Sequence, residues 1–150
     1  MIRGVSFKVL PSKRILWKIL KCLDIKKYCW YNIVDQCEVW ANYSGGICFE
    51  KGYYDGKCFL QNIMSDHFVI FLKLQAYKEN GNFFELHTYD EFQKSDCQIL
   101  ILINDCEFVE IYVKDIFHAK LIYQNAAKEG FKDIRYITES NDSRTKMDLV

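Results

Sequence analysis

The sequence has almost no proline, no long apolar run and no net charge, and each absence excludes a class of protein. One proline and seven glycines among 150 residues exclude a linker or a disordered chain. No apolar stretch approaches the roughly 20 residues that a membrane-spanning helix needs. Residues 1–8 lack the apolar region of a signal peptide. We therefore expect a cytoplasmic protein.

The charges of the chain cancel, because it has 20 basic and 20 acidic residues. Nucleic-acid affinity depends strongly on an excess of positive charge that neutralises phosphates. Basic residues also do not alternate with aromatic residues in the manner of an RNA-binding strand. The sequence therefore predicts no nucleic-acid partner and no membrane partner.

Metal and cofactor signals are missing as well. The seven cysteines are odd in number and form no CxxC pair, and the three histidines lie far apart. We expect free thiols in a reducing compartment and no metal site. The pair Gly45-Gly46 lacks the context of a phosphate-binding loop, so no cofactor is predicted.

What the sequence does contain is a core strand, Ile99 to Ile103. Five uninterrupted aliphatic residues bounded by turn residues predict a strand that is buried on both faces in the middle of a sheet. An antiparallel partner, Phe108 to Val113, is expected across the loop Asn104-Asp105-Cys106, followed by a long helix from Asp115 to Glu129. The remaining strands are predicted at 3–10, 28–34, 37–43, 47–50, 67–77 and 133–138, and the remaining helices at 13–23, 55–64 and 88–95.

Several boundaries depend on single residues. Ser12 is expected to cap the first helix, and Thr88 with Glu91 forms a capping box. Asp35-Gln36 is interpreted as the turn of a hairpin. Together the elements predict an α+β fold with a mainly antiparallel mixed sheet of about seven to eight strands and three to four helices. One globular domain is expected over residues 1–138, followed by a polar tail over 139–150.

The segments that carry a family resemblance are Arg3 to Phe7, Phe68 to Tyr77, Ser95 to Cys97, and Asp133 to Thr138 leading to Asn141 to Thr145. With these segments the chain resembles a small uncharacterised family of Gram-positive bacterial proteins of about this length. The resemblance implies a single-domain bacterial protein of the cytosol without an assigned activity. It transfers no catalytic residue.

Two weak chemical sites can be argued from the residues. Cys97 follows Asp96, and His87 precedes both, so a small hydrolase-like site with an activated thiolate is one hypothesis. A buried structural cysteine is the alternative, and it is preferred because no cysteine-protease signature surrounds Cys97. Arg144 in the polar tail could bind an anion, whereas a frayed terminus is the default for such a tail.

The excess of aromatic residues supports a different function. Aromatic residues make up 16% of the chain, and tyrosine and tryptophan concentrate where protein surfaces meet. Our leading hypothesis is a non-enzymatic module that binds a protein partner or a second copy of itself, and an inhibitory or toxin-neutralising protein belongs to the same class. Half-buried sheet residues are the alternative. The interface candidates are Trp30, Tyr31, Trp40, Tyr43, Tyr53 and Tyr54.

Overall fold

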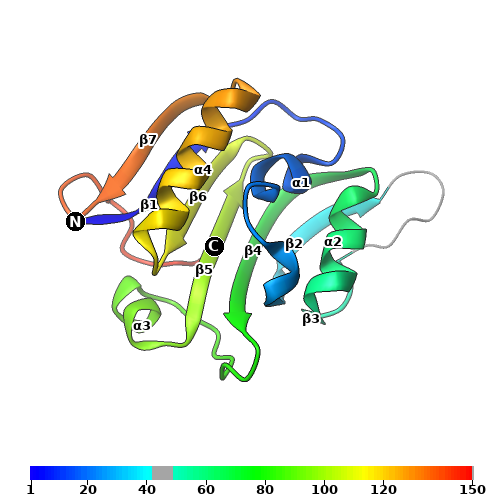
Figure 1. The fold of residues 1–150 in the computed structure, drawn as a ribbon, viewed down its shortest axis with the longest axis horizontal. Coiled ribbons are helices and arrows are strands. Elements are labelled where there is room, and N and C mark those ends of the chain that lie inside the picture. Colours follow the sequence, from blue (N-terminus) through cyan, green and yellow to red (C-terminus); the bar gives the residue numbers. More distant parts are fainter. Residues whose placement is uncertain (42–48, 150) are drawn as a thin grey trace.

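The structure, a computed structural model, describes residues 1–41 and 49–149. In these ranges seven strands form one sheet of the order β3-β2-β4-β5-β6-β1-β7, and every neighbouring pair is antiparallel (Figure 1). The strands are β1 (Ile2–Lys8), β2 (Tyr28–Ala41), β3 (Tyr53–Tyr54), β4 (His67–Lys78), β5 (Cys97–Asn104), β6 (Phe108–Val113) and β7 (Lys132–Thr138). The helices are α1 (Ile15–Leu20), α2 (Gly56–Met64), α3 (Tyr89–Lys94) and α4 (Ile116–Glu129), with a short 3-10 helix, η1 (Ile25–Lys27). The predicted α+β fold is confirmed.

Strand β5 lies in the middle of the sheet, between β4 and β6. Residues 99–103 are at most 1% exposed, so both faces of this strand are covered. Its apolar side chains alternate between two separate clusters: Ile99 and Ile101 point to one face, and Leu100 and Leu102 point to the other. This confirms the prediction from the aliphatic run.

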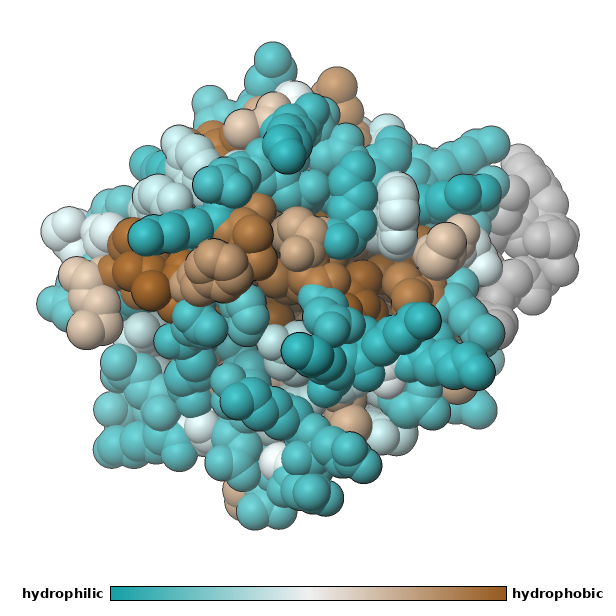
Figure 2. Space-filling view, viewed as in Figure 1, coloured by the Kyte–Doolittle hydropathy of each residue, from teal (hydrophilic) through white to brown (hydrophobic). Residues whose placement is uncertain are grey.

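The two faces of the sheet are covered differently. Helices α1, α2 and α4 cover one face and bury the larger apolar cluster (Figure 1). Hydrophobic side chains reach the surface in a band across this side of the molecule (Figure 2). A smaller cluster under α3 and the C-terminal segment, which includes Phe92, Tyr112 and Met147, covers part of the opposite face. We call this second side the open face, because a groove described below leaves part of it uncovered.

Most predicted helix ends are confirmed. The Asp55 carboxylate accepts a hydrogen bond from the N–H of Cys58 at the start of α2, and Thr88 accepts one from Glu91 at the start of α3. Gly130 ends α4 in the left-handed conformation, with φ at 77°. The cap at Ser12 is wrong: α1 begins after Arg14, and the Ser12 hydroxyl instead accepts a hydrogen bond from Lys18.

The hairpin at Asp35-Gln36 is also wrong, because β2 continues straight through these two residues. The long strand β4 pairs with β2 on both sides of these residues, and neither Asp35 nor Gln36 is a glycine that would permit a tight reversal. The extra residues form a bulge, in which β2 advances from Asn32 to Cys37 while β4 advances only from Leu74 to Leu72. The bulge places Gln36 on the open face.

Two further predictions fall partly on residues 42–48, which the structure does not describe. The strand predicted for Ile47 to Glu50 lies partly outside the described residues, and Phe49 and Glu50 belong to no strand. The cysteines in the described ranges are free, as predicted, whereas Cys48 lies outside them.

Candidate binding groove on the open face of the sheet

Residues 139–149, which we call the strap, cross the open face after β7 ends. The carboxylate of Asp142 accepts hydrogen bonds from Arg3 and from the hydroxyl of Tyr112, both at 3.1 Å. Arg144 donates to Oε1 of Glu110 through Nε at 3.1 Å and through Nη2 at 2.7 Å. The expectation of a frayed tail is therefore wrong for these residues, because tertiary contacts hold the strap on the sheet.

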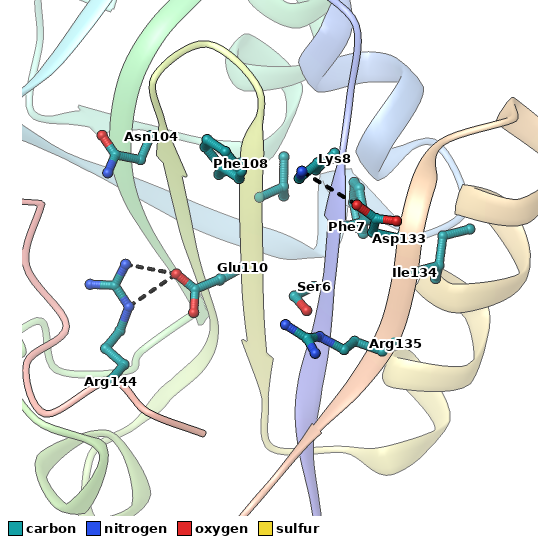
Figure 3. A pocket seen from close by; sticks show the side chains of 11 residues that line it. Ser6, Phe7, Lys8, Asn104, Phe108, Glu110, Asp133, Ile134, Arg135 and Arg144 are labelled. Carbon is teal, nitrogen blue, oxygen red and sulfur yellow. Dashed lines mark hydrogen bonds and ion pairs between the residues drawn. The ribbon is translucent and has the colours of Figure 1, made fainter. Parts of the chain in front are cut away.

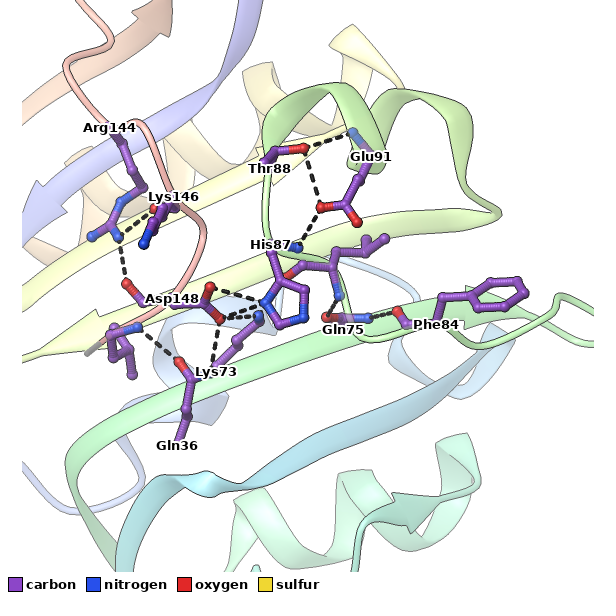
Figure 4. Close-up of polar contacts among 12 residues, drawn as sticks. Gln36, Lys73, Gln75, Phe84, His87, Thr88, Glu91, Arg144, Lys146 and Asp148 are labelled. Atoms are coloured by element: carbon purple, nitrogen blue, oxygen red, sulfur yellow. Dashed lines mark hydrogen bonds and ion pairs between the residues drawn. The ribbon is translucent and has the colours of Figure 1, made fainter.

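A buried lysine lies beneath the end of the strap (Figure 4). Lys73 on β4 is 0% exposed, and its ammonium donates hydrogen bonds to the carbonyl of Leu86 and, at 2.7 Å, to Oδ1 of Asp148. Gln36 donates to the same carboxylate at 2.8 Å, and Nδ1 of His87 lies 3.0 Å from Oδ2. Lys73, Gln36 and His87 thus surround one carboxylate.

These donors change the acidity of Asp148. Burial alone would raise the pKa of this carboxyl, because it disfavours the charged form. Hydrogen bonds from Gln36, Lys73 and His87, together with the charge of Lys73, outweigh burial and hold the pKa well below its usual range. Asp148 is therefore ionised wherever the protein is folded near neutral pH.

The uncovered part of the open face forms a groove of about 710 Å³ next to the strap (Figure 3). This volume falls within the roughly 300–1,000 Å³ of ligand pockets in proteins. Alternation along β1, β6 and β7 brings Ser6, Lys8, Glu110 and Arg135 to the same side, and Arg144 closes one end from the strap. The floor of the groove is therefore formed by three neighbouring strands of the sheet.

The groove has one more positive than negative side chain. Lys8 pairs with Asp133 at 3.4 Å, and Arg144 pairs with Glu110. Arg135 is exposed, and within residues 1–41 and 49–149 its side chain makes no ion pair or hydrogen bond. Its side chain extends from β7 across β1 towards Ser6 (Figure 3). An unpaired guanidinium in this position is able to bind a carboxylate or phosphate of another molecule.

The three residues of the weak catalytic hypothesis each contact a different group. Cys97 is 0% exposed, burial raises the pKa of its thiol to about 12, and the thiol donates to a backbone carbonyl at 3.3 Å. The Asp96 carboxylate accepts the N–H of Asn82, and His87 contacts Asp148. A cysteine nucleophile needs an accessible thiolate, which Cys97 does not provide in this fold.

Two of the predicted interface residues belong to the core. Trp30 is 0% exposed, stacks on Phe59 with ring centroids 4.3 Å apart, and donates its indole N–H to the carbonyl of Ile25. Tyr54 is 6% exposed. Trp30 and Tyr54 therefore stabilise the packing between β2, β3 and α2 instead of presenting rings to a partner.

The other predicted interface residues lie nearer the surface. Tyr31 is half-buried and stacks on Phe83 with centroids 4.3 Å apart, and Tyr53 is 46% exposed. Trp40 is 60% exposed and, with Phe68 opposite it on β4, lines an apolar pocket of about 220 Å³. Tyr43 lies outside the described residues.

Two other features, a metal site and a membrane-spanning helix, are also absent from the described residues. Across residues 1–41 and 49–149, no group of three histidine, cysteine or acidic side chains is placed to hold a metal ion. No helix of this part of the chain is both long and apolar enough to cross a membrane.

Sequence reasoning missed Lys73, Asp148 and Arg135. Lys73 did leave a signal, since a lysine interrupts the otherwise apolar run from Phe68 to Leu74. Asp148 and Arg135 left none, because their importance arises only when the strap and β7 meet the rest of the sheet.

Comparisons with known proteins support the resemblance noted from the sequence. The chain is 32% identical over 155 aligned positions to the uncharacterised protein YncE of Bacillus subtilis (strain 168), and the match covers 98% of this chain and 99% of that protein. No solved structure matches. Residues 2–148 match one protein family, and this range includes the strap as far as Asp148. The chain therefore belongs to the family described as "Protein of unknown function (DUF2691)".

Proposed function

We propose that this protein is a non-catalytic binding protein of the cytosol and that its groove binds an acidic segment of a protein partner. The observation that carries the proposal is Arg135, an exposed guanidinium in a preformed groove that no other described group neutralises. A role as an inhibitory or toxin-neutralising protein is one form of this proposal.

The remaining groove residues suit a peptide better than an isolated ion. Phe108 is 42% exposed, and Nζ of Lys8 lies 5.2 Å from the centre of its ring, so an apolar surface lies beside the basic one. A peptide segment supplies both kinds of group, with a carboxylate for Arg135 and carbon atoms for Phe108. Arginine favours this role because its planar guanidinium can make two parallel hydrogen bonds to one carboxylate.

Other partner classes have less support. A nucleic acid would meet a chain with equal numbers of basic and acidic residues. A cysteine-dependent enzyme would need a thiolate, whereas the pKa of Cys97 is raised by burial. The pocket beside Trp40 and Phe68 offers an additional apolar contact to a protein partner, and it has almost no polar lining.

The test is a titration of the ¹⁵N-labelled protein with a hexaglutamate peptide, followed by ¹H–¹⁵N correlation spectra. We expect chemical-shift changes to concentrate at Ser6, Glu110 and Arg135. The variant Arg135→Gln should bind the peptide at least roughly tenfold more weakly, since hydrogen bonds to a charged group contribute about 1.5–3 kcal/mol. Lys132→Gln is the matched control, because it removes the same charge from the same strand outside the groove.

Three results would contradict the proposal. Equal loss of affinity in Arg135→Gln and Lys132→Gln would mean that the peptide responds to overall charge and not to the groove. Binding of inorganic phosphate without binding of the peptide would make the groove a small-anion site. Shift changes confined to residues far from β1, β6 and β7 would place the binding surface elsewhere.

A further inference from the structure

The end of the strap is held in the way that proteins hold a bound peptide. The N–H of Met147 donates to the carbonyl of His87 at 2.8 Å, and the N–H of Leu149 donates to Oε1 of Gln36 at 2.7 Å. Arg144 of the strap itself donates to the carbonyl of Asp148 at 3.0 Å. The backbone on both sides of Asp148 is therefore recognised by groups that are far away in sequence.

The side chains of this segment are recognised as well. Met147 is 2% exposed and belongs to the same apolar cluster as Leu100 and Leu102 of β5. Leu149 packs against the edge of that cluster. Between them, the carboxylate of Asp148 points at Lys73 (Figure 4). The pattern is an acidic residue flanked by two apolar ones.

The donors around the carboxylate come from three separate elements. Lys73 lies on β4, Gln36 lies in the bulge of β2, and His87 lies in the loop before α3. An apolar side chain at position 73 would cover the sheet without the cost of burying an ammonium group. The buried Lys73 instead requires an anion, and the strap supplies that anion from outside the sheet.

We propose that the surface around Lys73, Gln36 and His87 is a second binding site. Its ligand is an extended peptide of a partner protein that carries an acidic residue between two apolar ones. When no partner peptide is bound, the strap occupies the site. The site does not rest on the proposed function, because Arg135 takes no part in it. The strap is tethered next to the site, so it competes with a free peptide at an effective concentration on the order of millimolar or higher. A partner peptide must displace the strap to bind.

The competition predicts how affinity responds to mutation. The substitution Asp148→Asn weakens the strap but leaves Lys73, Gln36 and His87 in place. A fluorescein-labelled peptide with the sequence of residues 143–149, Ser-Arg-Thr-Lys-Met-Asp-Leu, should bind full-length Asp148→Asn protein at least roughly tenfold more tightly than the unmodified protein, as measured by fluorescence anisotropy. The same peptide with asparagine in place of its aspartate should lose this binding.

Asp90→Asn is the matched control, because Asp90 is an exposed aspartate whose carboxylate pairs with Lys94 on the surface of α3 and with no other ionic group of the described residues. It should bind the peptide as the unmodified protein does. Circular dichroism shows whether Asp148→Asn folds. If it does not, the unmodified ¹⁵N-labelled protein is titrated with millimolar peptide instead. Binding at the proposed site should then shift the amide signals of His87, Met147 and Leu149.

Three results would overturn this inference. The first is equal binding of the aspartate and asparagine peptides. The second is binding that Asp148→Asn does not strengthen, or, where that variant does not fold, a titration that leaves the three amide signals in place. The third is a dimer of the unmodified protein, detected by light scattering, that dissociates on addition of the peptide; this would make the occupant the strap of a second copy and not a partner protein.

Discussion

The pair formed by Lys73 and Asp148 predicts an unusual order of stabilities for three variants. In Asp148→Ala the ammonium of Lys73, which is 0% exposed, loses its carboxylate and, among the described groups, keeps the carbonyl of Leu86 as its one partner. Breaking a buried pair from one side typically costs about 3–5 kcal/mol. Release of the strap would admit water to Lys73, so we expect a loss of about 3 kcal/mol, at the lower end of this range.

The reverse substitution should cost less. In Lys73→Met the side chain of Asp148, which is 14% exposed, keeps its hydrogen bonds to Gln36 and His87. We expect a loss of about 1 kcal/mol, the size of one hydrogen bond. The double variant Lys73→Met/Asp148→Ala should then be more stable than Asp148→Ala alone, because no buried ammonium remains.

Urea unfolding of the three variants at pH 7, followed by circular dichroism, measures these differences. A loss below about 1 kcal/mol for Asp148→Ala, or a double variant less stable than both single variants, would refute the reasoning. A pH series gives an independent check. The pKa of Asp148 is lowered in the folded state, so its contribution is present above the unfolded pKa of about 4 and is lost as the pH falls further. Asp148→Asn should remove this part of the acid dependence.

Three other predictions concern different parts of the fold. In the native protein Cys97 should resist Ellman's reagent while the exposed Cys58 reacts, and peptide mapping by mass spectrometry that finds Cys97 modified before unfolding would contradict its burial. Gly4→Ala should lower the unfolding free energy by about 2 kcal/mol or more, because a Cβ there would lie 1.8 Å from a backbone oxygen of β6. The control Gly52→Ala, whose Cβ would lie 3.8 Å from its nearest neighbours, should change the unfolding free energy by less than about 0.5 kcal/mol. The side-chain amide of Asn141 hydrogen-bonds to an N–H and a carbonyl on the edge strand β7. Asn141→Ala should therefore promote self-association, measured by light scattering, because it exposes these backbone groups. A variant that stays monomeric would mean that other groups protect this edge.

Local sequence patterns predicted the elements that local physics determines. The run Ile99 to Ile103 has to be a buried strand, and Asp115 and Gly130 mark the two ends of α4 through capping groups within a few residues. The strand at 28–41 was divided in two because Asp35 and Gln36 are typical turn residues. Only the pairing with β4, which is distant in sequence, keeps them in a strand.

The candidate sites were less predictable for the same reason. Arg144 is only a candidate anion-binding residue from the sequence, with a frayed terminus as the default, and its partner in the structure is Glu110 of this chain, 34 residues away. The strap was expected to be frayed because its composition is polar. Its Asp148 and Arg144 side chains pair with matching groups on β2, β4 and β6, which composition alone does not reveal.

The position of β1 between β6 and β7 has a consequence for how the chain folds during synthesis. Strand β1 precedes both of its neighbours, which begin at Phe108 and Lys132, so it cannot pair in the sheet before β6 has been made. Strands β2, β4, β5 and β6 pair with neighbours that follow one another closely, so they should assemble before Ile2–Lys8 joins the sheet. Pulse-labelling hydrogen exchange during refolding should therefore protect the amides of β5 before those of β1.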